Sequence, residues 1–127
     1  MQRTVLIVED AEACASTLEI IFSALDVAVV TAEDGEQAWR LLADGELNPA
    51  AIVTDLEMDH MDGFELIQRI RAHDGHKSVP IMVITGTADP DAADRARRLG
   101  ADAFFTKPYS PARVREKLEQ WLNHATS

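Results

Sequence analysis

Apolar residues gather in five short runs along the chain, and the segments between them show a longer apolar period. The runs are rich in β-branched residues and occupy residues 4–8, 27–31, 50–54, 80–85 and 103–106. The first, third and fourth runs are almost continuously apolar, which is typical of strands covered on both faces of a parallel sheet. The pattern predicts five strands.

The segments between the runs carry apolar residues at helical spacing. The first stripe consists of Leu18, Ile21, Phe22 and Leu25, and such a stripe indicates an amphipathic helix. Further stripes lie within residues 38–42, 66–70 and 114–122. The remaining helix, near 90–99, offers mainly alanine on its apolar face. We predict that this helix is the least firmly held, because it has little apolar area to bury.

Four of the predicted helices begin at a residue suited to capping. Asp34 and Asp62 each stand three positions before a Gln or Glu, which resembles a capping box with aspartate in the cap position. Asp89 and Ser110 each precede a proline, and proline is favoured at the first helical position. Asp62 therefore has a predicted structural role.

Strand and helix alternate five times with short connections and no linker. This order predicts an α/β fold, a three-layer sandwich with right-handed crossovers. The doubly wound strand order 2-1-3-4-5 of flavodoxin-like folds suits five parallel strands best. We expect a single domain over residues 1–127, with its core within about 3–123.

Composition narrows the class of partner. The 127 residues carry a formal net charge of −10, which argues against binding nucleic acid or an anionic membrane through the body of the protein. It favours a divalent cation or partners with basic patches. The N-terminal segment meets acids after a few apolar residues, so neither a signal peptide nor a membrane span is predicted there. The single cysteine points to a reducing, cytoplasmic location.

Three carboxylates follow two of the predicted strands. In doubly wound sheets, ligands bind beyond the carboxyl ends of the strands, where the strand order reverses. For the order 2-1-3-4-5 this point lies between the first and third strands, which end in Glu9-Asp10 and Asp55. Acids gathered there repel one another unless one is protonated or a cation neutralises them. Oxygen ligands with room for water suit Mg²⁺.

The other strand ends carry complementary groups. The fourth strand ends in Thr85-Gly86, and the fifth ends in Lys107-Pro108. A buried lysine without a partner is costly, so Lys107 is expected to face an anion. A hydroxyl, an approachable amide, an ammonium and carboxylates at one edge describe a place for a phosphoryl group, its metal and its nucleophile.

Several motifs at these strand ends together resemble the receiver domain of bacterial two-component response regulators. The motifs are "VLIVED", "VTDLEMDHMDG", "VITG" and "GADAFFTKP". Each is weak alone, but all stand in register at predicted strand ends. The resemblance covers residues 3–123, essentially the whole chain.

The resemblance implies a phosphorelay function. Asp55 corresponds to the phosphoacceptor that attacks a phosphohistidine of a histidine kinase or phosphotransfer protein. Asp10 and Asp55 would bind Mg²⁺ directly, Glu9 through water, and Glu57 through its backbone carbonyl. The metal and a lysine would offset the charge that repels the carboxylate from phosphorus. No turnover of a separate substrate is expected, only the protein's own phosphorylation and dephosphorylation.

The resemblance also implies a switch. Lys107 and Thr85 would each bind a phosphoryl oxygen, and Phe104 matches the aromatic residue that packs inward when Thr85 moves to the phosphate. The Lys107–Pro108 peptide bond is expected to be cis. The added charge would bias a two-state surface made of the fourth helix, the fifth strand and the fifth helix, to which a downstream protein binds.

Some positions depart from the family pattern. Asp59 stands where proline is common, and Gly86 stands where alanine is usual. Glu57 occupies a position expected to tune the lifetime of the acyl phosphate, either by steering water or by blocking it.

Three residues with ligand or nucleophile chemistry are interpreted as structural or surface residues. Cys14 lies among small residues with no basic residue near it in sequence, so we expect a packed thiol rather than a nucleophile. His73 and His76 have the spacing of metal ligands but lie in a polar segment without a third ligand nearby. We expect both histidines at the surface.

Other function classes share parts of this pattern. A flavodoxin-like cofactor binder needs a Ser/Thr/Gly-rich loop after the first strand, whereas "EDAEA" is acidic. An aspartate-based phosphatase would use Glu57 as its acid but would need a cap region. A pseudo-receiver that binds proteins without phosphorylation is the main alternative, and a receiver excised from a hybrid kinase or longer regulator is another. The sequence leaves open the kinase, the target and the oligomeric state.

Overall fold

Five strands and five helices alternate along the chain in the computed structural model, which describes residues 2–87 and 89–125. The strands are β1 (Arg3–Val8), β2 (Val27–Ala32), β3 (Ala51–Thr54), β4 (Ile81–Thr85) and β5 (Ala103–Thr106). The helices are α1 (Glu12–Phe22), α2 (Gly35–Ala43), α3 (Gly63–Ala72), α4 (Pro90–Leu99) and α5 (Pro111–Ala125). None of the described helices is both long and apolar enough to span a membrane.

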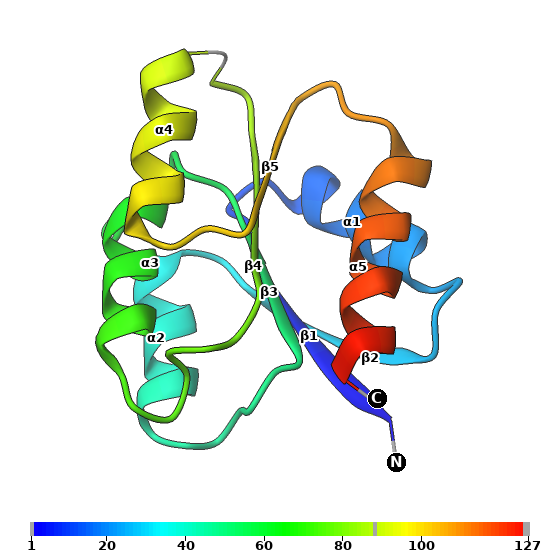
Figure 1. Ribbon diagram of the computed structural model, residues 1–127, viewed down its shortest axis with the longest axis horizontal. Helices are drawn as coiled ribbons and strands as arrows, with labels where there is room; N and C mark the ends of the chain where they lie inside the picture. The colour runs from blue at the N-terminus through cyan, green and yellow to red at the C-terminus, as the bar shows by residue number, and fades with distance from the viewer. Residues whose placement is uncertain (1, 88, 126–127) are drawn as a thin grey trace.

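The five strands form one parallel sheet in the order β2-β1-β3-β4-β5. Helices α1 and α5 cover one face of this sheet, and α2, α3 and α4 cover the other (Figure 1). The predicted three-layer α/β sandwich and its doubly wound, flavodoxin-like strand order are therefore confirmed.

The sheet separates the core into two clusters. Along β1, Leu6 and Val8 point into the cluster under α2, α3 and α4. Val5 and Ile7 point into the cluster under α1 and α5. All four side chains are fully buried, and burying each contributes about 1.5–3 kcal/mol relative to exposure. Burial on both faces explains why the first apolar run does not alternate with polar residues.

The predicted helix caps form. The cap oxygens of Asp34, Asp62, Asp89 and Ser110 accept from the N–H groups of Gln37, Glu65, Asp91 and Arg113, at 2.8, 2.9, 3.0 and 3.3 Å. The side chain of Gln37 accepts in return from the N–H of Glu33, one residue before the cap. These bonds satisfy N–H groups that the first turn of a helix leaves unpaired.

Helix α4 packs thinly, as its alanine face predicted. Ala96 is its one buried residue among those the structure describes, and Ala92 and Leu99 are partly buried. The guanidinium of Arg95 lies 4.1 Å from the centre of the Phe64 ring on α3. Whether α4 exchanges its amide hydrogens fastest remains a prediction.

One expectation was wrong. His76 is buried, not at the surface, and its Nε2 atom lies 2.9 Å from the carbonyl oxygen of Leu42. Leu42 lies in the last turn of α2, and its carbonyl also accepts from the N–H of Gly45, at 3.2 Å. The imidazole also stacks on His73 at 4.8 Å, and His73 meets the Trp39 ring edge-on. A polar ring can be buried here because its nitrogen pairs with a carbonyl at the end of α2.

Candidate functional site

Asp55 is held at the end of β3 by its own backbone. Its N–H donates to the carbonyl of Val8 on β1, at 3.1 Å, and its side chain is almost buried. Helix α3 begins directly against it, because a Cβ atom at Gly63 would lie 2.3 Å from the Asp55 carbonyl oxygen. Glycine at position 63 therefore lets the loop after β3 fold back tightly on the backbone of Asp55.

Lys107 forms ion pairs with two carboxylates from other strands. Its Nζ atom lies 2.7 Å from Glu9 Oε1 and 3.1 Å from Asp55 Oδ2. The side chains of Glu9 and Asp55 are only 4% and 9% exposed. Burial acts to lower the pKa of Lys107, but the two carboxylates outweigh it and raise the pKa above its ordinary value. The ammonium therefore stays protonated between them.

Asp55 is ionised because its hydrogen bonds favour the charged form. Its Oδ1 atom accepts from the N–H groups of Leu56 and Glu57, at 2.6 and 3.2 Å. Burial acts to raise the pKa of Asp55, but hydrogen bonds from Thr85, the Glu57 N–H and Lys107 lower it below its ordinary value. Thr85 is completely buried.

Glu9 has the opposite shift. Burial raises its pKa, the nearby Asp55 adds to this effect, and Lys107 only partly offsets it. Its Oε2 atom is buried and has no hydrogen-bond partner among the described residues. Leaving a buried acceptor unpaired costs about 1–3 kcal/mol, so this oxygen is suited to receive a donor or a cation.

The oxygens at this edge fit a hard cation that keeps part of its water shell. Asp10 is exposed and follows Glu9 along the wall of an open hollow that Asp59 and His60 also line. Within the described chain, no group of three or more His, Cys, Asp or Glu side chains is arranged to hold a metal alone. Mg²⁺ typically takes one or two carboxylates together with waters, which matches this set better than a closed metal centre.

The side chain of Glu57 points toward Thr87. The hydroxyl of Thr87 donates to Glu57 Oε1, and the Thr87 N–H lies 3.4 Å from Thr85 Oγ1. The sequence prediction omitted Thr87. A hydroxyl two residues after Thr85 was the available signal, but only the fold shows that it faces Glu57.

Cys14 lies beside Lys107, its Sγ atom 3.6 Å from Nζ. The thiol is half-buried, as expected of a packed cysteine, and it lines a mainly apolar hollow with Pro108 and Tyr109. The absence of a basic neighbour in sequence was misleading, because Lys107 reaches Cys14 from the end of β5. Burial raises the pKa of Tyr109, and Cys14 raises it further.

The remaining predicted positions lie on β5 and just after it. Phe104 is half-buried against the cluster under α2, α3 and α4. The Lys107–Pro108 peptide bond is cis, the isomer expected from the resemblance. Asp59 is exposed, and the next residue, His60, has a positive φ of 66°. The structure thus brings Glu9, Asp55, Thr85 and Lys107 together, with Asp10 and Glu57 at the rim.

Comparison with known proteins gives related sequences across the chain. The family model for the response regulator receiver domain matches residues 5–119. A chemotaxis protein CheY homolog of Campylobacter jejuni is 33% identical over 94 residues, which cover 74% of this chain and 72% of that protein. The 3',5'-cyclic-nucleotide phosphodiesterase regA of Dictyostelium discoideum is 29% identical over 119 residues, and the matched part is only 15% of its length.

Solved structures of the same fold cover almost the whole chain. The chemotaxis response regulator CheY4 of Vibrio cholerae has a TM-score of 0.83 and 25% identity, with 95% of this chain and 99% of that chain covered. The receiver domain of sensor histidine kinase PA1611 from Pseudomonas aeruginosa PAO1, solved with a magnesium ion in its active site cleft, has a TM-score of 0.85 and 25% identity, with 97% and 99% covered. With the match over residues 5–119, the chain belongs to the response regulator receiver domain family of two-component signalling.

Proposed function

We propose that the protein accepts a phosphoryl group on Asp55 from a phosphohistidine of a histidine kinase or phosphotransfer protein. The observation that carries this proposal is the contact of Lys107 Nζ with Asp55 Oδ2 at 3.1 Å. This contact places a fixed cation beside a carboxylate. Burial acts to raise the pKa of that carboxylate, but its hydrogen bonds outweigh burial and lower the pKa. A nucleophile in phosphoryl transfer must be ionised, and a nearby cation must offset the repulsion between it and the phosphoryl oxygens.

In the proposed reaction a carboxylate oxygen of Asp55 attacks the phosphorus atom. The bond between phosphorus and the histidine nitrogen breaks, the nitrogen keeps the electron pair, and Asp55 becomes an acyl phosphate. Lys107 would bind one phosphoryl oxygen and the Thr85 hydroxyl another. Both groups already contact Asp55, so both start beside the carboxylate that would carry the phosphoryl group.

Mg²⁺ is part of the proposal. Asp10 and Asp55 would hold it directly, Glu9 through water, and Glu57 through its backbone carbonyl. When bound, the ion would supply further positive charge to offset that of the phosphoryl group. The unpaired, buried Oε2 atom of Glu9 supports this assignment, as does the magnesium ion in the related Pseudomonas receiver domain.

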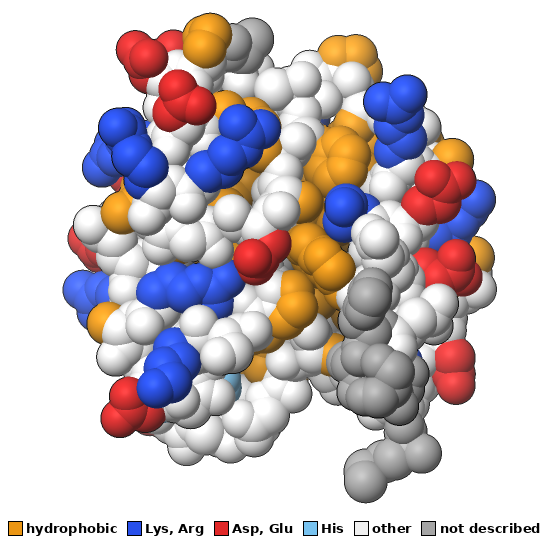
Figure 2. Space-filling view, viewed as in Figure 1, with side chains coloured by type: hydrophobic (Ala, Val, Ile, Leu, Met, Phe, Trp, Pro, Cys, Tyr) orange, Lys and Arg blue, Asp and Glu red, His pale blue; other side chains and the backbone are white. Residues whose placement is uncertain are grey.

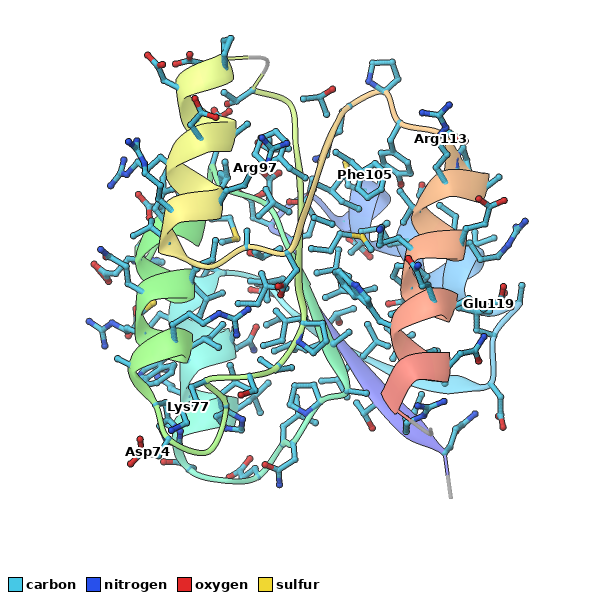
Figure 3. All side chains as sticks on the ribbon, viewed as in Figure 1. Asp74, Lys77, Arg97, Phe105, Arg113 and Glu119 are labelled. Atoms are coloured by element: carbon cyan, nitrogen blue, oxygen red, sulfur yellow. The ribbon has the colours of Figure 1, made fainter. Side chains whose placement is uncertain are left out.

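We further propose that phosphorylation switches the surface of α4, β5 and α5 for a downstream protein, with Thr85 and Phe104 as the moving residues. Figure 2 looks onto this surface and shows apolar side chains between α4 and α5, with Lys and Arg around them. Arg97 on α4 and Arg113 on α5 lie on opposite sides of Phe105 (Figure 3). Charge added at Asp55 can bias a surface of this kind when a two-state element connects them.

Residues 1–127 form one receiver domain, and Asp55 phosphorylation and dephosphorylation are its only reactions. The lone Cys14 supports a reducing, cytoplasmic location.

The test is phosphorylation by acetyl phosphate and Mg²⁺, followed by intact-mass and peptide mass spectrometry. We expect the wild type to gain one phosphoryl group on the peptide that contains Asp55, and Asp55→Asn to gain none. Asp59→Asn is the matched control, because Asp59 is an exposed acid of the same loop, and it should label normally. An unmodified wild type, or equal labelling of Asp55→Asn, would favour a binding module that works without phosphorylation.

A further inference from the structure

Arg71, near the end of α3, joins two neighbouring segments through one guanidinium. Its Nε and Nη2 atoms both donate to the carbonyl of Gly100, at 3.1 and 2.7 Å, and Nη2 also pairs with Asp102 Oδ2 at 2.9 Å. Its Nη1 atom donates to the carbonyls of Val79 and Lys77, at 2.7 and 3.1 Å. Arginine's planar fork can hold such a set of acceptors, which lysine cannot.

These contacts fix the C-terminal end of α4. Gly100 directly follows the helix with a φ of 120°, and its N–H donates to the carbonyls of Ala96 and Arg97. A Cβ atom at position 100 would lie 2.7 Å from Arg71 Nε, so glycine permits the close approach. Asp102 then binds the N–H of Ile81 at the start of β4, at 2.9 Å.

Among the residues that the structure describes, the N-terminal end of α4 has no comparable anchor. The side chain of Asp89 caps its own helix, and Asp94 pairs with Arg97 one turn later at 4.0 Å. Within the described part of the chain, the side-chain hydrogen bonds and ion pairs of residues 89–95 stay inside the helix. The contact of Arg95 with the Phe64 ring reaches α3, but it is a cation–π contact without the directional hydrogen bonds that Arg71 makes.

The free end of α4 is also the end nearest the site. Thr85 is buried beside Asp55, and Thr87 is bonded to Glu57. Both threonines precede Pro90, the first residue of α4. A change at Asp55 therefore reaches α4 through its N-terminal end, whereas Arg71 holds the opposite end over α3 (Figure 1).

We propose that Arg71 is a positioning residue that makes α4 pivot about its C-terminal end when Asp55 is phosphorylated. The first half of the helix, residues 90–95, then carries the change that a partner reads, and residues 97–101 keep their place. This inference rests on the proposed function. The part of α4 that responds to phosphorylation of Asp55 is then its first half and not the whole helix.

The test is amide hydrogen exchange, read by mass spectrometry, on protein with and without acetyl phosphate and Mg²⁺. In the wild type, exchange in residues 91–95 should change severalfold on phosphorylation, and exchange in 97–101 should stay the same. In Arg71→Met the change should spread into 97–101. Arg69→Met is the matched control, because Arg69 lies on α3 but pairs with Glu65 of its own helix at 3.5 Å, and it should match the wild type.

Three results would overturn the inference: equal changes in both halves of α4 in the wild type, no change in 91–95 of protein shown by mass to be phosphorylated, or an unaltered pattern in Arg71→Met. If Arg71→Met fails to fold, the comparison of the two halves of α4 in the wild type still tests the pivot. Arg71→Gln then replaces Arg71→Met as the variant. Absence of any phosphoryl mass gain would instead refute the proposed function, and the pivot would fall with it.

Discussion

The Nζ atom of Lys107 and the Oδ2 atom of Asp55 lie 3.1 Å apart, although 52 residues separate them in the chain. Both follow parallel strands, β5 and β3, and the carboxyl ends of parallel strands meet at one edge of the sheet. The pair is therefore a product of topology. A second carboxylate, Glu9 from β1, shares the same ammonium, so the loss of Lys107 would leave two buried acids facing each other.

Lys107→Met should slow phosphorylation of Asp55 by acetyl phosphate about 100-fold, the loss typical of removing one charge-stabilising donor. The rate is measured from the intact mass over time at a fixed Mg²⁺ concentration. Lys117→Met is the control, because Lys117 lies on α5 and its ammonium binds Gln120. A rate within twofold of the wild type for Lys107→Met would show that the ion pair is structural only.

Glu9→Gln should stabilise the metal-free protein at pH 7 by about 1 kcal/mol, or roughly 4 °C in Tm for a domain of this size. Burial raises the pKa of Glu9, and Asp55 adds to this effect. A raised pKa means that the stability Glu9 contributes is present below its unfolded pKa and is lost as the pH rises through its folded pKa. The extra stability of Glu9→Gln over the wild type should therefore shrink as the pH is lowered. Mg²⁺ should raise the Tm of the wild type more than that of Glu9→Gln.

Thermal melts of both proteins, from pH 7 to acidic pH, check the Glu9 prediction. Glu19→Gln on α1 is the matched control, because Glu19 is exposed, and its Tm should follow the wild type. A lower Tm for Glu9→Gln than for the wild type at pH 7 without metal would mean that the bond to Lys107 outweighs the cost of burying the charge.

Gly63→Ala should destabilise the protein by about 1–3 kcal/mol, the usual cost of forcing an extra carbon into a packed site. Its Cβ atom would lie 2.3 Å from the Asp55 carbonyl and 2.8 Å from the Cα atom of Leu56. Gly86→Ala is the contrast, since a Cβ there meets nothing within 4 Å, and it should stabilise by about 0.4–1 kcal/mol. Urea unfolding measures both, and equal effects would contradict this packing argument.

Thr87→Val should shorten the lifetime of the acyl phosphate at Asp55 severalfold. Without the hydroxyl, the Glu57 carboxylate loses the bond that holds it and becomes free to accept a hydrogen bond from an attacking water. Thr87→Ser keeps the hydroxyl and should decay like the wild type. The loss of phosphoryl mass after removal of the phosphodonor gives the rate, and a longer lifetime in Thr87→Val would show that Glu57 instead blocks water.

Amide exchange in the unphosphorylated protein should be faster in α4 than in the other helices. Ala96 is the buried residue of α4 in the described structure, whereas α3 buries Leu66, Ile67 and Ile70. Local opening is easiest where few apolar contacts are lost. Slower exchange in α4 than in α3 would contradict this expectation.

Much of the fold followed from local chemistry along the chain. The uninterrupted apolar run at Val5–Val8 required a strand covered on both faces, and the caps at Asp34 and Asp62 set where two helices begin. Strand ends then placed Asp55 and Lys107 at one edge. These features were predictable because each depends on a short segment and on one rule of sheet topology.

Side-chain relationships across the fold were harder to predict. His76 is buried because its ring nitrogen pairs with the carbonyl of Leu42 in α2, and no pattern near residue 76 indicates that carbonyl. The contact of Lys107 with Cys14 and the role of Arg71 as an anchor depend on side-chain directions in three dimensions. Such contacts join residues that are distant in sequence, so they leave no periodic signal.

Phe104 and Phe105 are consecutive on β5, yet Phe104 packs against the cluster under α2, α3 and α4, and Phe105 packs against the cluster under α1 and α5. Among the described residues, the two clusters share no side chain. A rearrangement confined to one cluster therefore moves no side chain of the other. A rotation of this edge strand would be felt on both sides at once. Strand β5 is thus placed where one movement would reach the helices on both faces of the sheet.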